Sequence, residues 1–358
     1  MTDWEARRAW HELLDLLRDA DQTFIEGDRA TGDETTAAEG YRYLTDALHA
    51  ATEIYVRSDA ARPSFVPIVG PSFKWGGDNS DSFYNFAPVS PAFEYLVRGR
   101  RGDAVYISIC VYGGPDDGRW STRIVSNLND RELTFEPDGS FEIVVSTKQP
   151  AGGRNWLPLA DDANAMITRD YHVDPRHGAP TIYSIETIPP QPPPAPLRDS
   201  EIAGRLRSVT NFLREVFAIT PIPDPAAPNT IADVWPVPAQ TYGWAAKDAH
   251  YAMGVFDLDD DEQLVVEGRS PECAYWGVML WNPFMQTFDY RYERIGINKQ
   301  QAVYEPDGSW RLVIAARDPG QPNWLSTAGH RHGILFFRWF LAEEMPVTPV
   351  AHVEKLTP

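Results

Sequence analysis

The sequence predicts a mainly β fold made of two tandem antiparallel β-sandwich or jelly-roll-like units from an internal duplication, with a helical N-terminal segment and a linker helix. From about residue 83 onward, apolar residues come in short runs separated by Gly- and Pro-containing turns, which is typical of antiparallel strands. Motifs of the first half also return in the second. Glu136–Ser140 (EPDGS) recurs as Glu305–Ser309, and Asn155–Leu157 (NWL) recurs as Asn323–Leu325, 169 and 168 positions later. These repeats indicate that one unit was copied.

Residues 1–60 are expected to form the helical N-terminal segment. Apolar residues recur at helical spacing from Trp4 to Asp19, and a second helix is expected from Thr35 to Val56. The first β-sandwich unit is expected over residues 61–188. Its predicted strands are residues 93–97, 104–112, 134–135, 141–146, 165–171 and 181–185. Helical patterns do not separate these strands, which disfavours a doubly wound α/β fold.

Residues 189–241 are expected to form a linker that contains one helix. Ile188–Pro196 reads IPPQPPPAP, and such a polyproline sequence is stiff and extended. Asp199 or Ser200 can cap the helix that follows, which is expected to end near Phe217.

The second β-sandwich unit is expected over residues 242–358. Its predicted strands are residues 263–267, 274–281, 287–292, 302–304, 310–315, 333–341 and 350–355. The helical pattern is repeated as well, because Leu44–Asp46 resembles Val209–Asn211, 165 positions later. Each unit is therefore expected to consist of a helix, an extended link and a sandwich.

The composition bounds the class of protein. The net charge of −19 disfavours nucleic acids and anionic membranes as partners, because both are bound by clustered Lys and Arg. The N-terminus is charged throughout and lacks the apolar run of a signal peptide, and no segment is apolar enough to span a membrane. The two cysteines form no disulfide framework and no metal-ligand pattern. We therefore expect a cytoplasmic protein, and a homo-oligomer is left open.

Several motifs of the second unit resemble those of one bacterial family. They are Trp276, Asp289-Tyr290, Asp307-Gly308, Asp318-Pro319-Gly320 and the run from Asn323-Trp324-Leu325 through Gly329-His330-Arg331 to Gly333. The family is catalogued as domain of unknown function 1214, and Asp78–Asp81 with Tyr84 resembles the segment that often precedes this domain in its long members. The resemblance implies a β-sandwich and no particular reaction. In the first unit, the Asn-Trp pair is not followed by Gly-His-Arg, so a site built on this motif is expected in the second unit.

The duplication also separates structural from functional candidates. Residues kept in both units are expected to serve the fold, whereas residues unique to one unit are freer to serve function. The Pro-Asp-Gly turns and the Asn-Trp pairs are shared. Arg169 and Arg338 are shared as well, and a buried arginine in an apolar strand needs a partner. For Arg338, a structural ion pair and a clamp for a substrate carboxylate or carbonyl are both open.

His330 and His332 occur only in the second unit. Alternate residues of a strand share a face, so a strand here would place both histidines on one side with Arg338. Histidine exchanges protons near neutral pH, which favours acid/base chemistry. A single histidine is more often a hydrogen-bonded surface or core residue, and that alternative stays open. A metal is disfavoured because no third ligand stands at a telling spacing.

Asp289 and the stretch from Asp78 to Asp81 are each found in one unit only. Asp289 follows an aromatic run, and the equivalent position of the first unit, 169 residues earlier, is Trp120. If Asp289 were buried beside these aromatic residues, the pKa of its carboxyl group would be raised. The alternative is an aspartate in water at the end of a strand. The Asp78–Asp81 stretch is either a polar turn or a loop that reaches the second unit's site, because domain junctions often bind ligands.

We expect a cofactor-independent acid/base enzyme, of lyase, isomerase or hydrolase type, that acts on a small apolar or aromatic metabolite. His330 would exchange the proton, Asp289 would be its polar partner, and Arg338 would hold a carboxylate or carbonyl. The substrate would be contacted by Trp276, Trp281, Tyr290, Asn323, Trp324, Arg331, His332, Asp78, Asn79, Asp81 and Tyr84. No metal or other cofactor is expected. The alternatives are a non-catalytic carbohydrate- or small-ligand-binding protein and a structural module, since sandwiches host all three.

Overall fold

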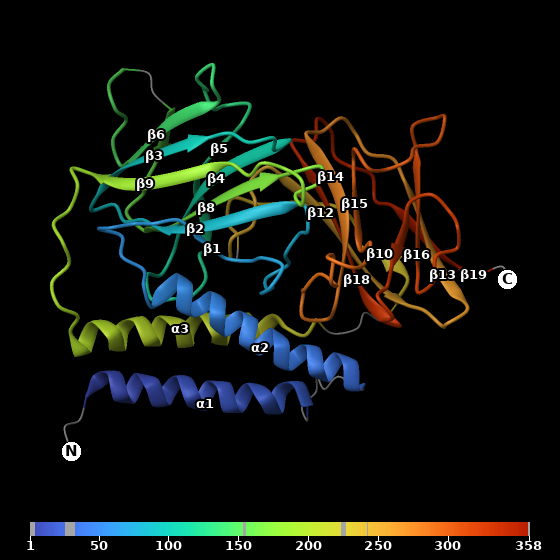
Figure 1. The fold of residues 1–358 in the computed structure, drawn as a ribbon, viewed down its shortest axis with the longest axis horizontal. Helices are drawn as coiled ribbons and strands as arrows, with labels where there is room; N and C mark the ends of the chain where they lie inside the picture. Colours follow the sequence, from blue (N-terminus) through green and yellow to red (C-terminus); the bar gives the residue numbers. More distant parts are fainter. Residues whose placement is uncertain (1–3, 26–32, 153–154, 223–226, 242, 357–358) are drawn as a thin grey trace. The chain divides into compact units, whose positions relative to one another are not determined.

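The computed structural model describes residues 4–25, 33–152, 155–222, 227–241 and 243–356, and it shows a mainly β chain with three helices (Figure 1). The chain divides into two compact units. Unit 1 comprises Met1–Phe73, Ser82–Ile219 and Pro238–Lys247, and unit 2 comprises Lys74–Asp81, Thr220–Val237 and Asp248–Pro358. None of the described helices is long and apolar enough to cross a membrane.

Unit 1 contains two sheets. One consists, from edge to edge, of β1 (Val66–Pro67), β2 (Ser82–Pro88), β8 (Ala163–Tyr171), β4 (Tyr106–Gly113) and β5 (Arg123–Asn129). The other consists of β7 (Asn155–Pro158), β6 (Ser140–Ser146), β3 (Glu94–Arg100) and β9 (Ile182–Ile188). Neighbouring strands are antiparallel except β6 and β7, which are parallel.

Unit 2 contains two sheets of the same kind. One consists of β10 (Thr230–Ile231), β12 (Ala249–Asp257), β18 (His332–Phe340), β14 (Tyr275–Trp281) and β15 (Gly296–Asn298), with β11 (Trp235–Pro236) also paired to β12. The other consists of β17 (Trp324–Ser326), β16 (Trp310–Ala315), β13 (Glu262–Gly268) and β19 (Val350–Lys355).

The strand order of the two units is the same. The order β2-β8-β4-β5 corresponds to β12-β18-β14-β15, and β7-β6-β3-β9 corresponds to β17-β16-β13-β19. The register is repeated as well, because Ser108 pairs with Arg169 in unit 1 and Gly277 pairs with Arg338 in unit 2, each 169 positions on. The parallel pair β6–β7 returns as β16–β17. The predicted duplication is therefore confirmed.

Alternate residues of the strands form one apolar core in each unit. Ile143 and Met166 belong to the core of unit 1. In unit 2 the core is more aromatic: the rings of Trp276 and Trp310 are stacked with their centroids 5.2 Å apart, and Trp310 stacks on Phe337 at 5.9 Å. β14 is buried along its whole length, so its side chains that point away from this core are covered as well.

The three helices of the described chain belong to unit 1. They are α1 (Glu5–Ile25), α2 (Glu34–Tyr55) and α3 (Asp199–Ile219). Asp33 caps α2 by accepting a hydrogen bond of 2.9 Å from the backbone amide of Thr36. Asp199, at the start of α3, accepts hydrogen bonds from the backbone amides of Glu5 and Ala6 at 2.8 and 3.1 Å. This carboxylate satisfies the free amides of α1 and fixes α1 to α3.

Three segments expected as strands lie in loops. Residues 134–135 and 302–304 are held by the side chains of Asn155 and Asn323, which bond the backbone groups that a strand partner would use. Residues 287–292 form an isolated bridge and a turn, because the carboxylate of Asp289 accepts a hydrogen bond of 3.1 Å from the backbone amide two residues on.

The observed units differ from the expected domain boundaries in two exchanged segments. Lys74–Asp81 directly precedes β2 of unit 1 but is part of unit 2. Pro238–Lys247 shortly precedes β12 of unit 2 but is part of unit 1. The helices, expected within residues 1–60 and 189–241, also belong to unit 1. Each sandwich is thus completed by a segment of the other repeat.

Candidate functional site in unit 2

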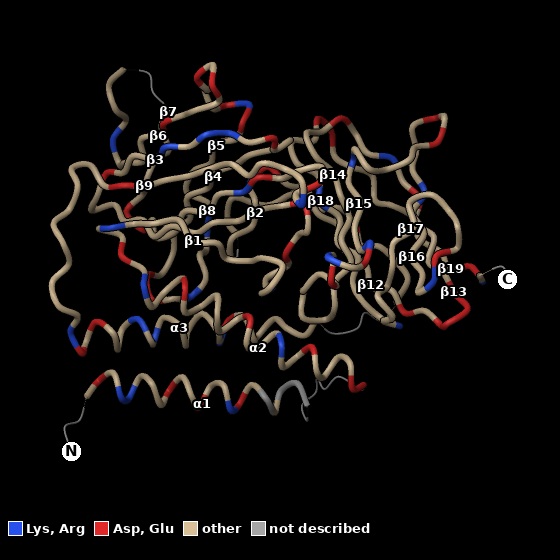
Figure 2. Tube along the Cα trace, in the orientation of Figure 1, with Lys and Arg blue, Asp and Glu red and all other residues tan. Residues whose placement is uncertain are grey.

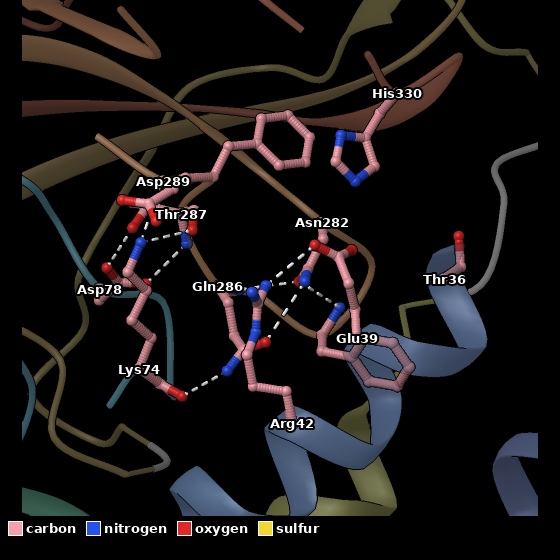
Figure 3. A network of polar contacts seen from close by, with 12 residues as sticks. Thr36, Glu39, Arg42, Lys74, Asp78, Asn282, Gln286, Thr287, Asp289 and His330 are labelled. Carbon is pink, nitrogen blue, oxygen red and sulfur yellow. Dashed lines mark hydrogen bonds and ion pairs between the residues drawn. The ribbon is translucent and has the colours of Figure 1, made fainter. Parts of the chain in front are cut away.

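A buried polar cluster forms where the Lys74–Asp81 segment packs on unit 2. The amide of Gln286 donates to the carbonyl of Lys74 at 2.7 Å, and the Lys74 ammonium donates to the carbonyls of Thr287 and Phe288 at 2.8 and 2.9 Å (Figure 3). Lys74 is only 8% exposed, so these bonds compensate for the loss of water around its charge. The first part of the segment is thereby fixed.

Arg338 and Trp281 hold the middle of the segment. The Arg338 guanidinium donates to the carbonyl of Gly77 and lies 5.0 Å from the ring centroid of Trp281. The Trp281 indole donates to the carbonyl of Asp78 at 2.9 Å. Gly77 has φ +79°, and a Cβ there would lie 2.9 Å from the Trp281 ring, so the close approach requires glycine. Arg338 therefore meets a backbone carbonyl and an aromatic face.

Asp81 ends the segment as a buried carboxyl group. Its Oδ2 accepts hydrogen bonds of 2.9 Å from the Tyr275 hydroxyl and from the Asn298 amide, and its Oδ1 has a longer contact of 3.4 Å with Ser80. Burial raises the pKa of Asp81 to about 6, although the hydrogen bonds from Asn298, Tyr275 and Ser80 oppose the rise. This carboxyl can therefore take up or release a proton near neutral pH.

Asp78 is a second buried carboxyl group, three residues before Asp81. Its two oxygens accept hydrogen bonds from the backbone amide of Thr287, at 2.8 Å, and from the Thr287 hydroxyl, at 2.5 Å (Figure 3). Burial raises the pKa of Asp78, and Lys74, Thr287 and Arg338 partly offset this rise. Two carboxyl groups and two cations thus lie within one segment and the strand beneath it.

The structure brings several of the predicted site residues together here. Asp78, Asp81, Trp281 and Arg338 share the contacts described above. Asn79 joins them, because its amide lies 3.4 Å from the Tyr275 hydroxyl that bonds Asp81. Tyr290 is adjacent, with the Lys74 ammonium 4.3 Å from its ring centroid. The Asp78–Asp81 stretch, for which a polar turn and a loop reaching the second unit's site were both open, is therefore part of unit 2.

Asp289 does not have the raised pKa that burial was expected to give it. Arg291 donates to both carboxylate oxygens of Asp289 at 2.8 and 2.7 Å. These bonds lower the pKa of Asp289 to about 2, and its side chain remains 35% exposed. Asp289 thus serves a surface turn rather than a proton transfer near neutral pH.

His330 lies away from both of its expected catalytic partners. Its ring stacks on Phe288 at 4.2 Å, and its Nδ1 lies 3.0 Å from the carbonyl of Thr327. β18 begins only at His332, and six residues of strand span roughly 20 Å to Arg338. Figure 3 likewise shows His330 well apart from Asp289. Only His332 of the two histidines shares the strand face of Arg338.

Two of the expected substrate contacts serve the core and the loops instead. Trp276 points into the core, and its indole donates to the Tyr304 hydroxyl at 3.0 Å. The amide of Asn323 donates to the carbonyls of Val303 and Arg311 at 2.7 and 3.1 Å.

Three further candidates lie outside the cluster. The Trp324 indole donates to the carbonyl of Ala315 at 3.1 Å. Arg331 is an exposed residue that forms ion pairs of 3.2 and 2.8 Å with Asp257 and Asp259. Tyr84 belongs to β2 of unit 1, where its hydroxyl lies 2.7 Å from that of Tyr171.

Sequence reasoning did not identify Tyr275 and Asn298 as partners of Asp81. Tyr275 belonged to an aromatic run, and Asn298 stood at the place of Asn129 in the other unit, which indicated a structural role. Asn298 does serve its loop, because its Oδ1 accepts hydrogen bonds from the amides of Gln300 and Gln301 at 3.2 and 3.3 Å. Its amide nitrogen is left for Asp81, and the sequence carries no signal for that second contact.

Within the described ranges, no group of three or more His, Cys, Asp and Glu side chains is placed to hold a metal ion. What the cluster offers is a titratable carboxyl group, a phenol, an amide and a guanidinium, which together suit proton transfer on a bound carbonyl or carboxylate.

Comparisons with known proteins place the chain in a family. A crystal structure of an uncharacterized protein from Burkholderia cenocepacia is 33% identical, with a TM-score of 0.86 over 98% of this chain and 97% of that one. A Vibrio parahaemolyticus protein shares the fold at 12% identity, with a TM-score of 0.52 over 96% of this chain and 100% of that one. No curated protein matches. The family described as "Protein of unknown function (DUF1214)" matches residues 88–175 and 240–344, one segment in each repeat. The chain therefore belongs to the DUF1214 family, which its motifs had indicated.

Proposed function

We propose that the protein is a cytoplasmic, cofactor-independent acid/base enzyme that acts on a small apolar or aromatic metabolite, with Asp81 as the proton-exchanging group. The observation that carries this proposal is the buried Asp81 carboxyl, whose pKa of about 6 lies near the working pH of such an enzyme. The Tyr275 hydroxyl, 2.9 Å from Asp81, would be the second proton-bearing group. Arg338 would orient a carboxylate or carbonyl of the substrate.

The duplication supplies a stringent comparison for this proposal. Asp248 stands at the place equivalent to Asp81, 167 positions on, so the carboxyl group itself is common to both repeats and only its surroundings can single out Asp81. The Lys74–Asp81 segment adds Lys74 and Asp78 at the places of Thr241 and Ala245. These two buried charged residues belong to one repeat alone, which favours a role in function at this end of unit 2.

The proposal is tested by proton exchange on carbon. The full-length protein would be incubated in D₂O with phenylpyruvate and other small aromatic carbonyl compounds, and proton NMR would follow exchange or conversion. Asp81→Asn is expected to lower the rate by about 10² to 10⁴, the usual contribution of a positioned acid or base. Asp248→Asn, the matched control, should stay within a few-fold of the unmodified protein.

The pH dependence gives a second criterion. If Asp81 acts as a base, the rate should rise with pH through a midpoint near 6, because the ionised carboxylate is the active form. Equal losses in Asp81→Asn and Asp248→Asn, or no exchange on any of the compounds, would contradict the proposed enzyme.

A cluster of aromatic rings in unit 2, of which Trp235 is exposed, favours a second candidate, a non-catalytic binding protein for a carbohydrate or a small apolar ligand. Phe336 stacks on Trp281 at 4.4 Å and lies 5.1 Å from Tyr251, and Trp235, which is 36% exposed, lies 6.2 Å from Tyr251. Such faces suit aromatic ligands and sugar rings. Quenching of tryptophan fluorescence by the same compounds, unchanged in Asp81→Asn and without any turnover, would favour this candidate.

The distribution of charge supports a small molecule rather than a nucleic acid as the partner. Lys and Arg are interspersed with the more numerous Asp and Glu along the described parts of both units (Figure 2). Phosphate backbones are bound by gathered cations, which this distribution does not offer.

A further inference from the structure

We propose that unit 1 holds a separate binding site for a small neutral polyhydroxylated molecule, a polyol or monosaccharide, at the end of its sandwich where Asp130, Asp170, Thr181 and Tyr183 meet. Asp170 lies near the end of β8, Asp130 directly follows β5, and Thr181 and Tyr183 lie at the start of β9. The site goes beyond the proposed function, which rests on unit 2.

Four buried polar atoms of these side chains point to a ligand. In the part of the chain that the structure describes, Oδ1 of Asp130, Oδ1 of Asp170, Oγ1 of Thr181 and the Tyr183 hydroxyl have no hydrogen-bond partner. Asp170 is 0% exposed and Thr181 is 7% exposed. Buried polar atoms are nearly always hydrogen-bonded. The Thr181 and Tyr183 hydroxyls lie within reach of each other, so the two carboxylate oxygens are the atoms that chiefly indicate a further bonding molecule.

Backbone contacts bring three of these groups together: the Thr181 amide donates to Oδ2 of Asp170 at 3.0 Å, and the Asp130 amide donates at 3.1 Å to the carbonyl of Ile107, the residue that pairs with Asp170. The pKa of Tyr183 is raised, first by burial, then by the Asp170 carboxylate, and also by Asp130, while Thr181 and Arg101 oppose the rise. The influence of these neighbours on the pKa of Tyr183 agrees with the placement that the backbone contacts give. The two carboxylates would accept hydrogen bonds from a ligand, and the two hydroxyls can both donate and accept them.

The balance of charge at this end indicates a neutral ligand. Arg101 donates to Oδ2 of Asp130 at 3.0 Å, and His172 lies 3.1 Å from Oδ2 of Asp170. The second ring nitrogen of His172 lies 2.7 Å from Asp103. Burial lowers the pKa of His172, but the hydrogen bonds to Asp170 and Asp103 raise it overall, which favours the cationic imidazolium. Each buried carboxylate therefore already faces a cation, and a further anion would be repelled.

A comparison with unit 2 indicates that large side chains are missing at this end. Asp170 and Thr168 stand at the places of Trp339 and Phe337, whose stacked rings fill the corresponding end of unit 2 with centroids 5.6 Å apart. The strand register supports the equivalence. Asp170 pairs with Ile107 in unit 1, and Trp339 pairs with Trp276, which stands 169 positions after Ile107, in unit 2. Unit 1 thus replaces two large rings by two small polar side chains.

The remaining neighbours suit a ligand with both hydroxyl groups and C–H faces. The ring of Tyr183 lies 6.1 Å from that of Phe141, which in turn lies 5.5 Å from Phe135. Aromatic rings beside carboxylate and hydroxyl groups are the surroundings that a sugar or polyol prefers, because its C–H groups pack on the rings while its hydroxyls bond the polar atoms. The partly exposed side chain of Asp103, at 58%, marks where this cluster meets solvent.

The test uses three probes, glycerol, myo-inositol and D-glucose, titrated calorimetrically into the full-length protein. We expect at least one to bind. Tyr183→Phe removes only the hydroxyl oxygen and Asp170→Asn keeps the shape of the side chain, so both variants should fold, and each should weaken binding by about tenfold or more. Asp138→Asn is the matched control, because it removes one carboxylate from an exposed turn of the same unit.

The outcomes separate this site from the alternatives. Binding that is weakened by Tyr183→Phe and Asp170→Asn but kept in Asp138→Asn supports the site, whatever happens at Asp81 in unit 2. No heat with any of the three probes would mean that ordered water satisfies the four atoms, and the proposal would then be wrong. Binding that none of the variants weakens would place the probe elsewhere and would overturn the proposal equally. Because the readout is binding at unit 1, it does not depend on the enzyme proposed for unit 2.

Discussion

The two units hold their exchanged segments through equivalent contacts to backbone carbonyls. In unit 1, the Arg169 guanidinium donates to the carbonyl of Trp244. The Tyr112 hydroxyl donates to the carbonyl of Ala245 at 2.6 Å. Both donors belong to the sheet of β2, β8, β4 and β5, and both acceptors to Pro238–Lys247.

Unit 2 repeats this arrangement with one difference. Arg338 and Trp281 stand 169 positions after Arg169 and Tyr112, and they donate to the carbonyls of Gly77 and Asp78, 167 positions before Trp244 and Ala245. The carbonyl contact is therefore common to both repeats, whereas the carboxyl group of Asp78 replaces the methyl group of an alanine. Docking needs the main chain of the segment, so its buried carboxyl group is an addition of one repeat.

The largest expected effect on stability concerns Trp339, whose large ring in unit 2 has the small Asp170 as its counterpart in unit 1. Trp339 is buried, and its indole donates to the Ser270 hydroxyl at 2.9 Å. Trp339→Ala should lower the free energy of unfolding by about 3–5 kcal/mol, because it removes a large ring from a close-packed core. At the equivalent position of unit 1, Asp170→Asn should cost only about 1–2 kcal/mol.

Urea unfolding at pH 7, followed by circular dichroism, measures both changes. Trp339→Phe is the control, since it keeps most of the apolar contact and should cost less than Trp339→Ala. Similar losses for Trp339→Ala and Asp170→Asn would show that the two ends are stabilised alike.

Arg169 and Arg338, which hold the exchanged segments, should give the next largest effect on stability, and the effect should be equal for the two residues. Arg338→Met and Arg169→Met keep an apolar stem but leave the carbonyls of Gly77 and Trp244 without these donors. Each change should cost about 2–4 kcal/mol in the free energy of unfolding, since a buried charge-assisted hydrogen bond is lost. Denaturation with urea should give values within about 1 kcal/mol of each other. A loss confined to one repeat would mean that the segments are not held equivalently.

The carboxyl of Asp81 should make stability depend on pH. Its pKa is raised from 3.8 to about 6, so between these values the folded protein keeps a proton that the unfolded chain has released. This contribution stabilises the fold below pH 4 and is lost as the pH rises to 6. Relative to Asp81→Asn, the unmodified protein should lose about 2–3 kcal/mol between pH 4 and pH 7, because a tenfold change in proton affinity is worth about 1.4 kcal/mol.

Unfolding free energies of the two proteins, measured at intervals between pH 4 and 7, check this. A difference that stays constant over the range would mean that the Asp81 carboxyl titrates normally, and the proposed acid/base role would lose its basis.

The sequence was informative where a local pattern determines the structure. Short apolar runs between Gly- and Pro-containing turns predicted the strands, and the repeated EPDGS turns predicted the duplication, because both patterns can be read from the chain itself. The exchange of Lys74–Asp81 depends on donors more than 200 residues away, such as Arg338, and no local pattern encodes such a contact. For the same reason, the sequence predicted Asp81 only as one of eleven substrate contacts and not as the central residue of the site.

The expected trio of His330, Asp289 and Arg338 illustrates the limit of residue type as a guide. His330 was expected to share a strand face with Arg338, but the strand starts two residues later, and a positive φ at Gly329 turns the chain before it. For Asp289, a buried carboxyl group and an aspartate in water were both open, and Arg291, two residues on, holds it at the surface. Short-range polar contacts overrode the pattern in both cases.

The smallest effect on stability is expected at the Pro-Asp-Gly turns, which both repeats contain in the same conformation. Gly139 and Gly308 close the equivalent Pro-Asp-Gly turns with φ +81° and +82°. Alanine is strained at such angles, so Gly139→Ala and Gly308→Ala should each cost about 1 kcal/mol. A Cβ would meet atoms at 3.7 Å in the first turn and at 3.1 Å in the second, where the neighbour is the mobile end of Arg269. The two costs should therefore agree closely in urea unfolding. A much larger cost for Gly308→Ala would show that Arg269, which also bonds Asp307, has a fixed position that unit 1 lacks.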